Sequence, residues 1–298
     1  MSDVASPTPP SPLLSVQGLT MRFGGILALN NVNFEVQKNS ITALIGPNGA
    51  GKTTVFNCVT GFYKATEGQV ILNDNGKTTN LRKVLGEKFQ WSDYVNPPAF
   101  LERLYYKTFG GSHRVNQAGV ARTFQNIRLF REMTVMENLL VAQHNHLDRN
   151  LIRGMLNTKH YRASEKRALE TAYYWLEVVN LTEDANRLAG DLPYGNQRRL
   201  EIARAMCTEP KLVCLDEPAA GLNPRETVEL STLIRHLRDK HNVTVLLIEH
   251  DMGLVMGISE HIVVLDYGQV IAAGTPAEIE VNPKVLAAYL GTEEGDAS

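Results

Sequence analysis

The sequence has few cysteines, no long apolar run and no excess of positive charge. The three cysteines, Cys58, Cys207 and Cys214, show no Cys-x-x-Cys spacing, and each lies in or beside an apolar run. We therefore expect buried, reduced thiols rather than metal ligands. No stretch reaches the roughly 18 apolar residues of a membrane-spanning helix, so we expect none. A net charge of −2 gives no support for a nucleic-acid partner, and we expect no such partner.

Both ends of the chain have the composition of tails. Met1 to Pro12 is rich in serine and proline and lacks the basic-then-apolar pattern of a signal peptide, so we expect residues 1–12 to form a disordered tail. Residues 292–298 are expected to form an acidic tail. Between the tails, residues 13–291 alternate strand and helix patterns. This alternation predicts an α/β fold with a largely parallel core sheet.

The segment from Gly46 to Thr54 matches the Gly-x-x-x-x-Gly-Lys-[Ser/Thr] pattern of a phosphate-binding loop. The apolar run Ile41–Ile45 before it predicts a buried strand, and Thr53 to Thr60 can continue as a helix. Glycines let the backbone wrap closely around an anion, and N–H groups at a helix start point at phosphate oxygens. We expect Lys52 to reach the β- and γ-phosphates and Thr53 to ligate Mg²⁺. The predicted nucleotide-binding residues of the loop are Gly46, Pro47, Asn48, Gly49, Ala50, Gly51, Lys52, Thr53 and Thr54.

Two short segments before the loop predict a pair of strands. Leu13–Phe23 has the pattern of a first strand, and Asn33–Val36 that of its antiparallel neighbour. Phe23 ends the first strand with an aromatic ring. Such a ring can stack on adenine, worth roughly 1–3 kcal/mol, or can be an ordinary core phenylalanine. The residue alone does not decide between these two interpretations.

After the loop, segments with a clear secondary-structure pattern are separated by a segment without one. Gln69–Leu72 predicts a strand, and the Asn-Asp-Asn-Gly turn chemistry of Asn73–Thr79 predicts a hairpin or tight loop. Asn80–Gln117 is irregular, and only Leu101–Thr108 in it predicts a short helix. Val120–Gln125 is a strand-like run that ends on a glutamine. No chemistry follows from the irregular stretch by itself.

The middle of the chain has helical periodicity. Thr134–Gln143 predicts a helix with Thr134 as its cap and Glu137 three residues later, a capping box. Tyr161–Asn180 carries apolar residues at helical spacing. These segments predict a mostly helical part between two α/β parts.

The second half of the chain places polar groups after apolar strands. Leu200–Cys207 predicts a helix whose start carries Gly195 and a basic turn, a pattern typical of an anion site. Lys211–Leu215 predicts a buried strand that ends in Asp216 and Glu217. Carboxylates at the carboxyl end of a strand lie where α/β folds place ligand chemistry.

The last predicted elements follow in the same way. Asn223 and Pro224 are the cap and first residue of a predicted helix. The apolar strand Thr244–Ile248 is followed by Glu249, His250 and Asp251. His261–Leu265 and Gln269–Ala273 flank a hairpin turn, and short helices are expected to finish the chain.

In order and spacing, these motifs resemble those of the nucleotide-binding subunits of ABC transporters, and within them the ATPases of branched-chain amino acid importers. The resemblance covers Leu13 to Gly291, apart from an apparent insertion at about 80–117. It implies a P-loop ATPase fold with a mostly parallel core sheet, an antiparallel β subdomain and a helical subdomain at about 134–205. Besides the phosphate loop, the segments that carry it are Arg122–Gln125, Tyr194–Arg204, Leu215–Pro224, Ile248–Met252 and Asn282–Gly291.

The resemblance implies roles for residues outside the phosphate loop. Asp216 would hold Mg²⁺, and Glu217 would be the general base that polarises the attacking water. His250 would contact the γ-phosphate and orient the water and the base. Gln125 would touch Mg²⁺ or the water and sense the membrane subunit, and Phe23 would stack on the adenine of ATP.

The resemblance also implies partners. Gly195 and Asn196 would complete the ATP site of a second ATPase subunit, a related chain or a copy of this one, paired head to tail. Two transmembrane permease subunits would bind the ATPases at the cytoplasmic face of the inner membrane, fed by an extracytoplasmic solute-binding protein. The implied function is ATP hydrolysis that powers import of branched-chain or related amino acids.

The sequence departs from the usual family pattern at two motifs. Pro193-Tyr194-Gly195-Asn196 stands where Ser-Gly-Gly-Gln is common, so the serine is absent and Pro193 has no N–H donor. Contact with a partner's γ-phosphate would then rest on the Gly195 N–H, Asn196 and the helix dipole. Asn223 stands where an aspartate is common.

Three alternatives remain open. The same ATPase role could serve urea, amides or another solute, because the ATPase does not contact the cargo. A soluble ABC ATPase of DNA repair or translation is disfavoured by the single phosphate loop and the absence of heptads and paired cysteines. A homologue that binds ATP without hydrolysing it is disfavoured by the presence of Lys52, Asp216, Glu217 and His250.

Overall fold

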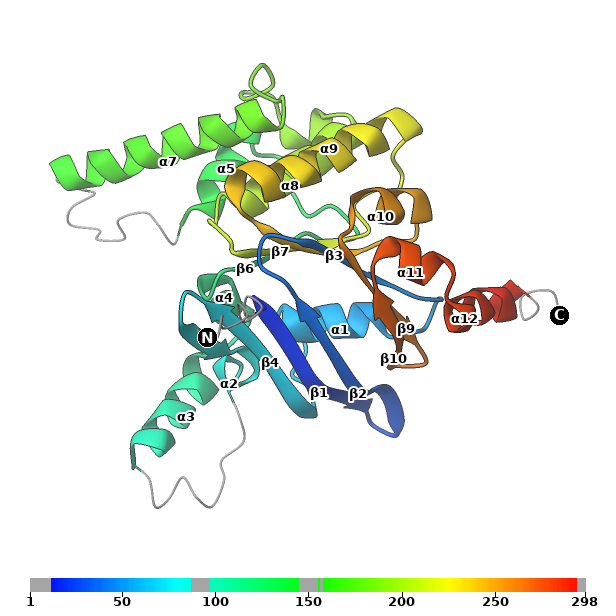
Figure 1. Cartoon of the computed structure of the whole chain (residues 1–298). Helices are drawn as coiled ribbons and strands as arrows, with labels where there is room; N and C mark the ends of the chain where they lie inside the picture. Colours follow the sequence, from blue (N-terminus) through cyan, green and yellow to red (C-terminus); the bar gives the residue numbers. More distant parts are fainter. Residues whose placement is uncertain (1–11, 87–96, 145–154, 156–157, 294–298) are drawn as a thin grey trace, which may run out of the picture. The chain divides into compact units, whose positions relative to one another are not determined.

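The computed structural model describes residues 12–86, 97–144, 155 and 158–293 (Figure 1). The chain divides into two compact units, one formed by residues 1–111 with 259–298 and the other by residues 112–258. The predicted tail at 1–12 lies outside the described residues except for Pro12. So do residues 294–298 of the predicted acidic tail and residues 87–96 of the predicted insertion.

The first unit contains a four-stranded antiparallel sheet in the order β2-β1-β4-β5 (Figure 1). Its strands are β1 (Leu14–Phe23), β2 (Ile26–Val36), β4 (Glu67–Asp74) and β5 (Lys77–Asn80). The predicted first strand, its antiparallel neighbour and the hairpin at 73–79 are confirmed. The predicted start of the second strand at Asn33 is wrong, because β2 already pairs at Ile26 with Phe23. The first residues of β2 are exposed, with Ile26 at 71%, so they lack the alternation that marks a half-buried strand.

The first unit also holds the strand that leads into the phosphate loop. β3 (Ile41–Ile45) pairs in parallel with β9 (His261–Asp266), which pairs antiparallel with β10 (Gln269–Gly274). β3 has the predicted bounds and is fully buried. The predicted hairpin turn is confirmed at Tyr267 and Gly268, both with positive φ. The helices that accompany these strands are α1 (Lys52–Val59), α11 (Pro276–Glu280) and α12 (Pro283–Glu293).

The stretch between Asn80 and Gln117 is more helical than its sequence pattern indicates. Its described helices are α2 (Leu81–Val84), α3 (Pro97–Phe109) and α4 (Ser112–Gln117). The predicted helix Leu101–Thr108 lies inside α3. Asn80 caps α2, since its side chain accepts hydrogen bonds from the backbone N–H groups of Arg82 and Lys83. The irregular interpretation is therefore wrong for most of the described residues.

The second unit has three parallel strands and a set of helices (Figure 1). The strands are β6 (Val120–Arg122), β7 (Leu212–Asp216) and β8 (Thr244–Ile248), and the helices include α5 (Val135–Ala142), α7 (Lys159–Val178), α8 (Tyr194–Met206), α9 (Pro224–His241) and α10 (Met252–Ile258). Every residue of β7 and β8 is buried, which is typical of parallel strands covered on both faces. Across the parts of the chain that the structure describes, no helix is both long and apolar enough to cross a lipid bilayer.

Capping chemistry decides where two helices of the second unit begin. The side chain of Thr134 accepts from the N–H of Glu137, and Glu137 accepts from the N–H of Thr134, so the predicted capping box of α5 is confirmed. Asn223 and Glu226 form the same reciprocal pair at α9, which confirms Asn223 as its cap.

The start of α8 differs from the prediction. The helix begins at Tyr194 rather than Leu200, with Pro193 as its N-cap. Gly195 therefore lies inside the first turn instead of before the helix. Apolar periodicity marks only the later turns of α8, because its first turn is polar. A proline at the N-cap costs the helix nothing, since the carbonyl of Pro193 still accepts from Gln197 N–H at 3.0 Å.

All three cysteines are buried free thiols, as predicted. Burial raises the pKa of Cys58 and of Cys207 to about 12 and also raises the pKa of Cys214. The thiolate is the reactive form, so these groups are expected to be inert in the folded chain.

We expect the native protein to react with a thiol reagent such as DTNB at pH 8 at least about 100-fold more slowly than free cysteine. Unfolding in guanidinium should release three reactive thiols per chain. Rapid modification of any thiol in the native protein would contradict the burial of that site.

Candidate functional site

The predicted phosphate loop joins β3 to α1, and two of its glycines occupy positions that no larger residue can take. Gly46 has φ 149°, and a Cβ there would lie 2.0 Å from the carbonyl oxygen of Leu265. Gly51 has φ 100° and is the N-cap of α1, and a Cβ there would lie 2.8 Å from Leu29 Cδ2. The tight path of the loop therefore depends on both glycines.

The helix that follows the loop has no side-chain cap. Its N-cap, Gly51, makes no side-chain hydrogen bond to the first turn of α1, and that turn carries no acidic residue. The N-terminal N–H groups and the helix dipole therefore present positive potential beside the loop. Asn48, Gly49 and Thr53 are exposed, whereas Gly46, Pro47 and Ala50 are buried. This arrangement suits an anion that approaches the exposed tip of the loop.

Lys52 is a buried cation at this loop. Its side chain is 6% exposed, and its Nζ donates to the carbonyl oxygens of Gly46 at 2.7 Å and of Pro47 at 2.9 Å. The ammonium is therefore held at the loop by the backbone that we expect to surround phosphate.

Phe23 lies at the end of β1 and is not a core residue. It is 41% exposed, and its ring centroid lies 5.3 Å from that of Tyr63 in an edge-to-face arrangement. The core alternative for Phe23 is therefore wrong. An exposed aromatic pair in the unit that holds the phosphate loop fits the predicted adenine contact. The sequence pattern did not single out Tyr63, because it lies in the bend after α1, far along the chain from Phe23 on β1.

The three predicted catalytic side chains meet in the second unit. Gln125 Nε2 donates to Glu217 Oε2 at 2.7 Å, and His250 Nε2 lies 2.7 Å from Glu217 Oε1. The Glu217 side chain is 17% exposed and that of His250 is 47% exposed. Both oxygens of one carboxylate are thus oriented by partners, and the group still reaches solvent.

Glu217 has an unusual backbone conformation. Its φ of 45° lies in the left-handed region, which costs about 1–3 kcal/mol for a residue with a side chain. Its N–H donates to the carbonyl of Ile248 at 2.9 Å, so the residue is tied to the end of β8. Strain of this kind persists where the surrounding structure holds it and is common at functional sites.

Glu249 supports this arrangement, although the sequence analysis gave it no role. It is 4% exposed and accepts from Ala219 N–H at 2.6 Å and from His250 N–H at 3.0 Å. Burial raises the pKa of its carboxyl, while these backbone donors oppose the rise. Glu249 therefore connects the segment after β7 to the residue that contacts Glu217.

Asp216 is buried and paired with a cation. Its Oδ2 accepts from Arg122 Nη2 at 2.7 Å, and both side chains are at most 10% exposed. Burial raises the pKa of Asp216, and Arg122 opposes the rise. The structure thus places a counter-ion on the carboxylate predicted to bind Mg²⁺. In the sequence, the only feature that marks Arg122 as a possible partner of a carboxylate is its position as a basic residue inside a strand-like apolar run.

The start of α8 carries Gly195 and Asn196. Gly195 is buried against the side chain of Glu226, where a Cβ would lie 2.6 Å from Glu226 Oε1. The Asn196 side chain accepts from Arg199 Nη2 at 2.6 Å. No side chain caps this helix either, so its N-terminal N–H groups remain suited to an anion.

Arg198 connects α8 to the segment that carries Gln125. This side chain has no exposed surface. Its guanidinium donates to the carbonyl oxygens of Phe124 at 2.7 Å and of Gln125 at 2.8 Å, and to Glu201 Oε2 at 3.0 Å. Burial raises the pKa of Glu201, and Arg198 opposes the rise. The position of Gln125 therefore depends on a residue of α8.

Replacing Arg198 with methionine should destabilise the protein by about 3–5 kcal/mol, because it leaves Glu201 buried without the cation that donates directly to it. Arg167→Met, on the exposed side of α7, is the control and should change the unfolding free energy by less than about 0.5 kcal/mol. Urea denaturation of both variants measures the difference. A loss below about 1 kcal/mol at Arg198 would contradict the buried pair.

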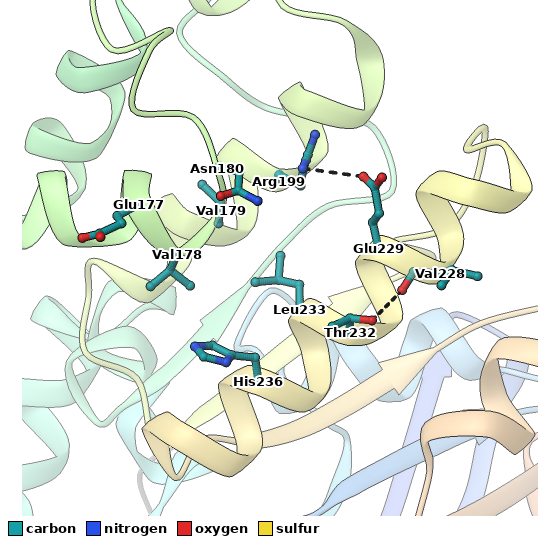
Figure 2. Close-up of a pocket in the computed structure, with 10 residues that line it drawn as sticks. All are labelled: Glu177, Val178, Val179, Asn180, Arg199, Val228, Glu229, Thr232, Leu233 and His236. Atoms are coloured by element: carbon teal, nitrogen blue, oxygen red, sulfur yellow. Dashed lines mark hydrogen bonds and ion pairs between the residues drawn. The ribbon is translucent and has the colours of Figure 1, made fainter.

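A pocket of about 730 Å³ lies between α7, α8 and α9 (Figure 2). Its polar lining includes Glu177 and the ion pair of Arg199 with Glu229, whose closest atoms are 3.7 Å apart. It contains none of the residues predicted to act on a nucleotide. With two carboxylates and a paired arginine in its lining, it is not suited to a triphosphate.

The predicted site residues therefore fall into two groups. Phe23 and the phosphate loop belong to the first unit, and Gln125, Asp216, Glu217, His250 and the start of α8 belong to the second. Within each group, the structure shows local geometry suited to nucleotide chemistry.

Comparisons with known proteins identify the family to which this chain is similar. The family described as "ABC transporter" matches residues 29–220, and one described as "Branched-chain amino acid ATP-binding cassette transporter" matches residues 269–295. Over 280 residues, the chain is 54% identical to the high-affinity branched-chain amino acid transport ATP-binding protein BraF of Pseudomonas aeruginosa. Over the same length it is 53% identical to the high-affinity branched-chain amino acid transport ATP-binding protein LivG of Escherichia coli K12. Each alignment covers 94% of this chain and 98% of the relative.

A solved structure agrees with these relatives. The ADP conformation of MJ1267, an ATP-binding cassette of an ABC transporter, superposes with a TM-score of 0.72 at 30% sequence identity. The superposition covers 94% of this chain and 99% of MJ1267. The predicted fold class is therefore confirmed. The phosphate loop and the contacts of Gln125 and His250 with Glu217 agree with these matches. The chain therefore belongs to the ABC transporter family, as an ATP-binding protein.

Proposed function

We propose that this chain binds ATP with Mg²⁺, hydrolyses it, and thereby powers import of branched-chain amino acids through membrane permeases. The observation that carries the proposal is the Glu217 carboxylate, held by Gln125 and His250 directly after Asp216. The cargo is taken from the names of the BraF and LivG relatives.

ATP would bind with its phosphates at the loop of the first unit. The uncapped start of α1 and the buried ammonium of Lys52 supply the positive potential. Phe23 would stack on the adenine, supported at its ring by Tyr63. The glycine path at Gly46 and Gly51 lets the backbone come close to the phosphate oxygens.

Mg²⁺ would be held by Thr53, Gln125 and Asp216. The donors are a hydroxyl, an amide oxygen and a carboxylate, the hard oxygen ligands that Mg²⁺ prefers. Gln125 contacts Glu217 through Nε2, so its amide oxygen is not used in that bond. Burial raises the pKa of the Asp216 carboxyl, and the hydrogen bond and charge of Arg122 oppose that rise. When bound, the ion would neutralise charge on the phosphates.

Glu217 would take the proton of the attacking water on a carboxylate oxygen. His250 Nε2 fixes Oε1 and Gln125 Nε2 fixes Oε2, so the carboxylate is oriented before the water arrives. A correctly placed general base contributes about 10²–10⁴ in rate. Arg198 and Glu249 would support the reaction indirectly, through the backbone of Gln125 and of His250.

A second ATPase subunit would supply the other half of each ATP site. The first turn of α8, with Gly195 and Asn196, has no side-chain cap and would face the γ-phosphate bound by the partner. Two permeases at the cytoplasmic face of the inner membrane would receive the motion, and an extracytoplasmic solute-binding protein would deliver the cargo.

Within this proposal, residues 13–291 form one ATPase domain. Its helical subdomain spans about 134–205 and contains α5, α7 and α8. The insertion at about 80–117, with α2, α3 and α4, would alter the surface that faces the permease or would decorate the edge of a sheet.

Affinity purification of the tagged chain from detergent-solubilised membranes tests the proposal. We expect two permeases and a second ATPase to co-purify, with vanadate-sensitive ATPase activity in the same sample. Recovery of the chain alone, or with nucleic acid, from the soluble fraction would contradict the transporter assignment. Addition of binding proteins loaded with leucine, urea or an amide would then identify the cargo by stimulation of hydrolysis.

A further inference from the structure

The side chain of Asn196, in the first turn of α8, is held by a residue one turn later on the same helix. Arg199 Nη2 donates to Asn196 Oδ1 at 2.6 Å. Residues three positions apart lie on one face of a helix, so the two side chains can meet. A guanidinium carries donors and no acceptor. The atom of the Asn196 amide that faces Arg199 is therefore its oxygen.

This contact decides the orientation of the Asn196 amide. Because Oδ1 is turned to Arg199, the NH₂ group lies on the other side of the amide. Within the described ranges of the chain, no protein group accepts a hydrogen bond from that NH₂ group. Asn196 is half-buried, in a helix start that has no side-chain cap. A donor there adds to the attraction that the helix N–H groups exert on an anion, whereas a reversed amide would present its oxygen and repel the anion.

A residue of α9 holds the other arm of the Arg199 guanidinium. Arg199 Nη1 lies 3.7 Å from Glu229 Oε2 (Figure 2). Glu229 Oε1 in turn accepts from Arg225 Nε at 3.2 Å, from one turn earlier on α9. The Arg199 side chain is 24% exposed, so it is largely enclosed. Two nitrogens of one planar group thus have separate partners, which fixes the plane of the guanidinium as a single contact could not.

We propose that Arg199 is a positioning residue for ATP hydrolysis, because it holds the Asn196 amide with its NH₂ group toward the γ-phosphate bound by the second subunit. The proposal rests on the proposed function, in which the start of α8 faces that phosphate. Arg199 would not touch the nucleotide itself and would act through Asn196. A donor that is aimed at developing charge beforehand needs no reorganisation when the charge forms, so its orientation affects the rate.

Arg199→Met removes both contacts of the guanidinium and keeps most of the aliphatic stem. We expect kcat for ATP hydrolysis by the purified transporter complex to fall by about 3- to 10-fold, the range of one hydrogen bond. Binding of a fluorescent ATP analogue by the isolated full-length chain should be unchanged, because that nucleotide would bind at the phosphate loop of the same chain. The contrast between hydrolysis and binding separates positioning from damage to the fold.

Two further variants show which contact of Arg199 matters. Arg225→Met is the matched control, because Arg225 is an exposed cation that contacts the same Glu229, and it should hydrolyse ATP like the wild type. Asn196→Ala removes the amide itself and should lower kcat at least as much as Arg199→Met does. In the Asn196→Ala background, Arg199→Met should cost less than about 2-fold more, because residues that act through one contact are not additive.

Several outcomes would overturn the inference and leave the proposed function intact. They are wild-type hydrolysis in Arg199→Met or in Asn196→Ala, an equal loss in Arg225→Met, and fully additive losses in the double variant. Loss of analogue binding by the isolated Arg199→Met chain would assign Arg199 to the fold and would also overturn it. A wild-type complex without ATPase activity would overturn the proposed function together with the inference.

Discussion

Replacing Glu217 with glutamine should slow ATP hydrolysis by about 10²- to 10⁴-fold and leave ATP binding intact. The carboxylate is the group that would accept a proton from water, and an amide cannot do so. Glutamine fits the same space and partners. Its oxygen can accept from Gln125 Nε2, and its NH₂ group can donate to a neutral His250 Nε2, in place of the two 2.7 Å contacts of the carboxylate. The fold should therefore be unaffected.

The measurement is phosphate release by the purified transporter complex, with binding of a fluorescent ATP analogue measured on the same samples. Glu183→Gln, at an exposed glutamate in the same unit, is the control and should hydrolyse ATP like the wild type. Near-normal hydrolysis by Glu217→Gln would exclude Glu217 as the base. Loss of binding together with hydrolysis would instead assign it to nucleotide binding.

Replacing Lys52 with methionine should weaken ATP binding by about 10- to 100-fold, the effect of a hydrogen bond to a charged group. Methionine keeps most of the aliphatic stem, so the buried volume beside the loop remains filled. What is lost is the ammonium that donates to Gly46 and Pro47 and that would contact the phosphates. Loss of these donors should also loosen the loop.

Calorimetric titration with ATP and Mg²⁺ measures this effect. Lys77→Met changes an exposed lysine of β5 in the same unit and should leave the affinity unchanged. Comparable affinity in Lys52→Met and wild type would place the phosphates away from this loop. Because EDTA removes Mg²⁺, a repeat titration in EDTA separates the lysine's contribution from that of the ion.

Local sequence patterns were sufficient where neighbours along the chain determine the structure. The strands Ile41–Ile45 and Thr244–Ile248 have the predicted bounds, because continuous apolar runs of this length are typical of buried strands. The boxes at Thr134 and Asn223 depend on residues three positions apart. The phosphate loop is likewise a local motif, in which glycine positions and the helix start follow each other directly.

Contacts between distant segments could not be predicted in this way. Arg122 lies 94 positions from Asp216, and Arg198 lies 74 positions from Phe124. A single sequence shows a basic residue in an apolar run but not the carboxylate or carbonyl that accepts its protons. The early start of α8 escaped prediction for another reason, since its first turn is polar and has no apolar periodicity.

The family resemblance predicted that separate polar residues form one site, which neither local patterns nor single contacts can show. Alone, Glu217, His250 and Gln125 are three polar residues at strand ends, and each has an ordinary structural explanation. Their order along the chain predicted a common site, and in the structure Gln125 and His250 both contact the carboxylate of Glu217. Their roles in hydrolysis, and those of Gly195 and Asn196 toward a second subunit, stay predictions.

ATP-driven uptake of labelled leucine into proteoliposomes tests the central claim most directly. The liposomes would contain the permeases and ATPases that co-purify with this chain, with the binding protein supplied on the opposite side from ATP. We expect leucine to accumulate with the wild-type chain and ATP, and accumulation to stop with Glu217→Gln. A wild-type complex that hydrolyses ATP but moves no leucine, or uptake that persists with Glu217→Gln, would contradict the account.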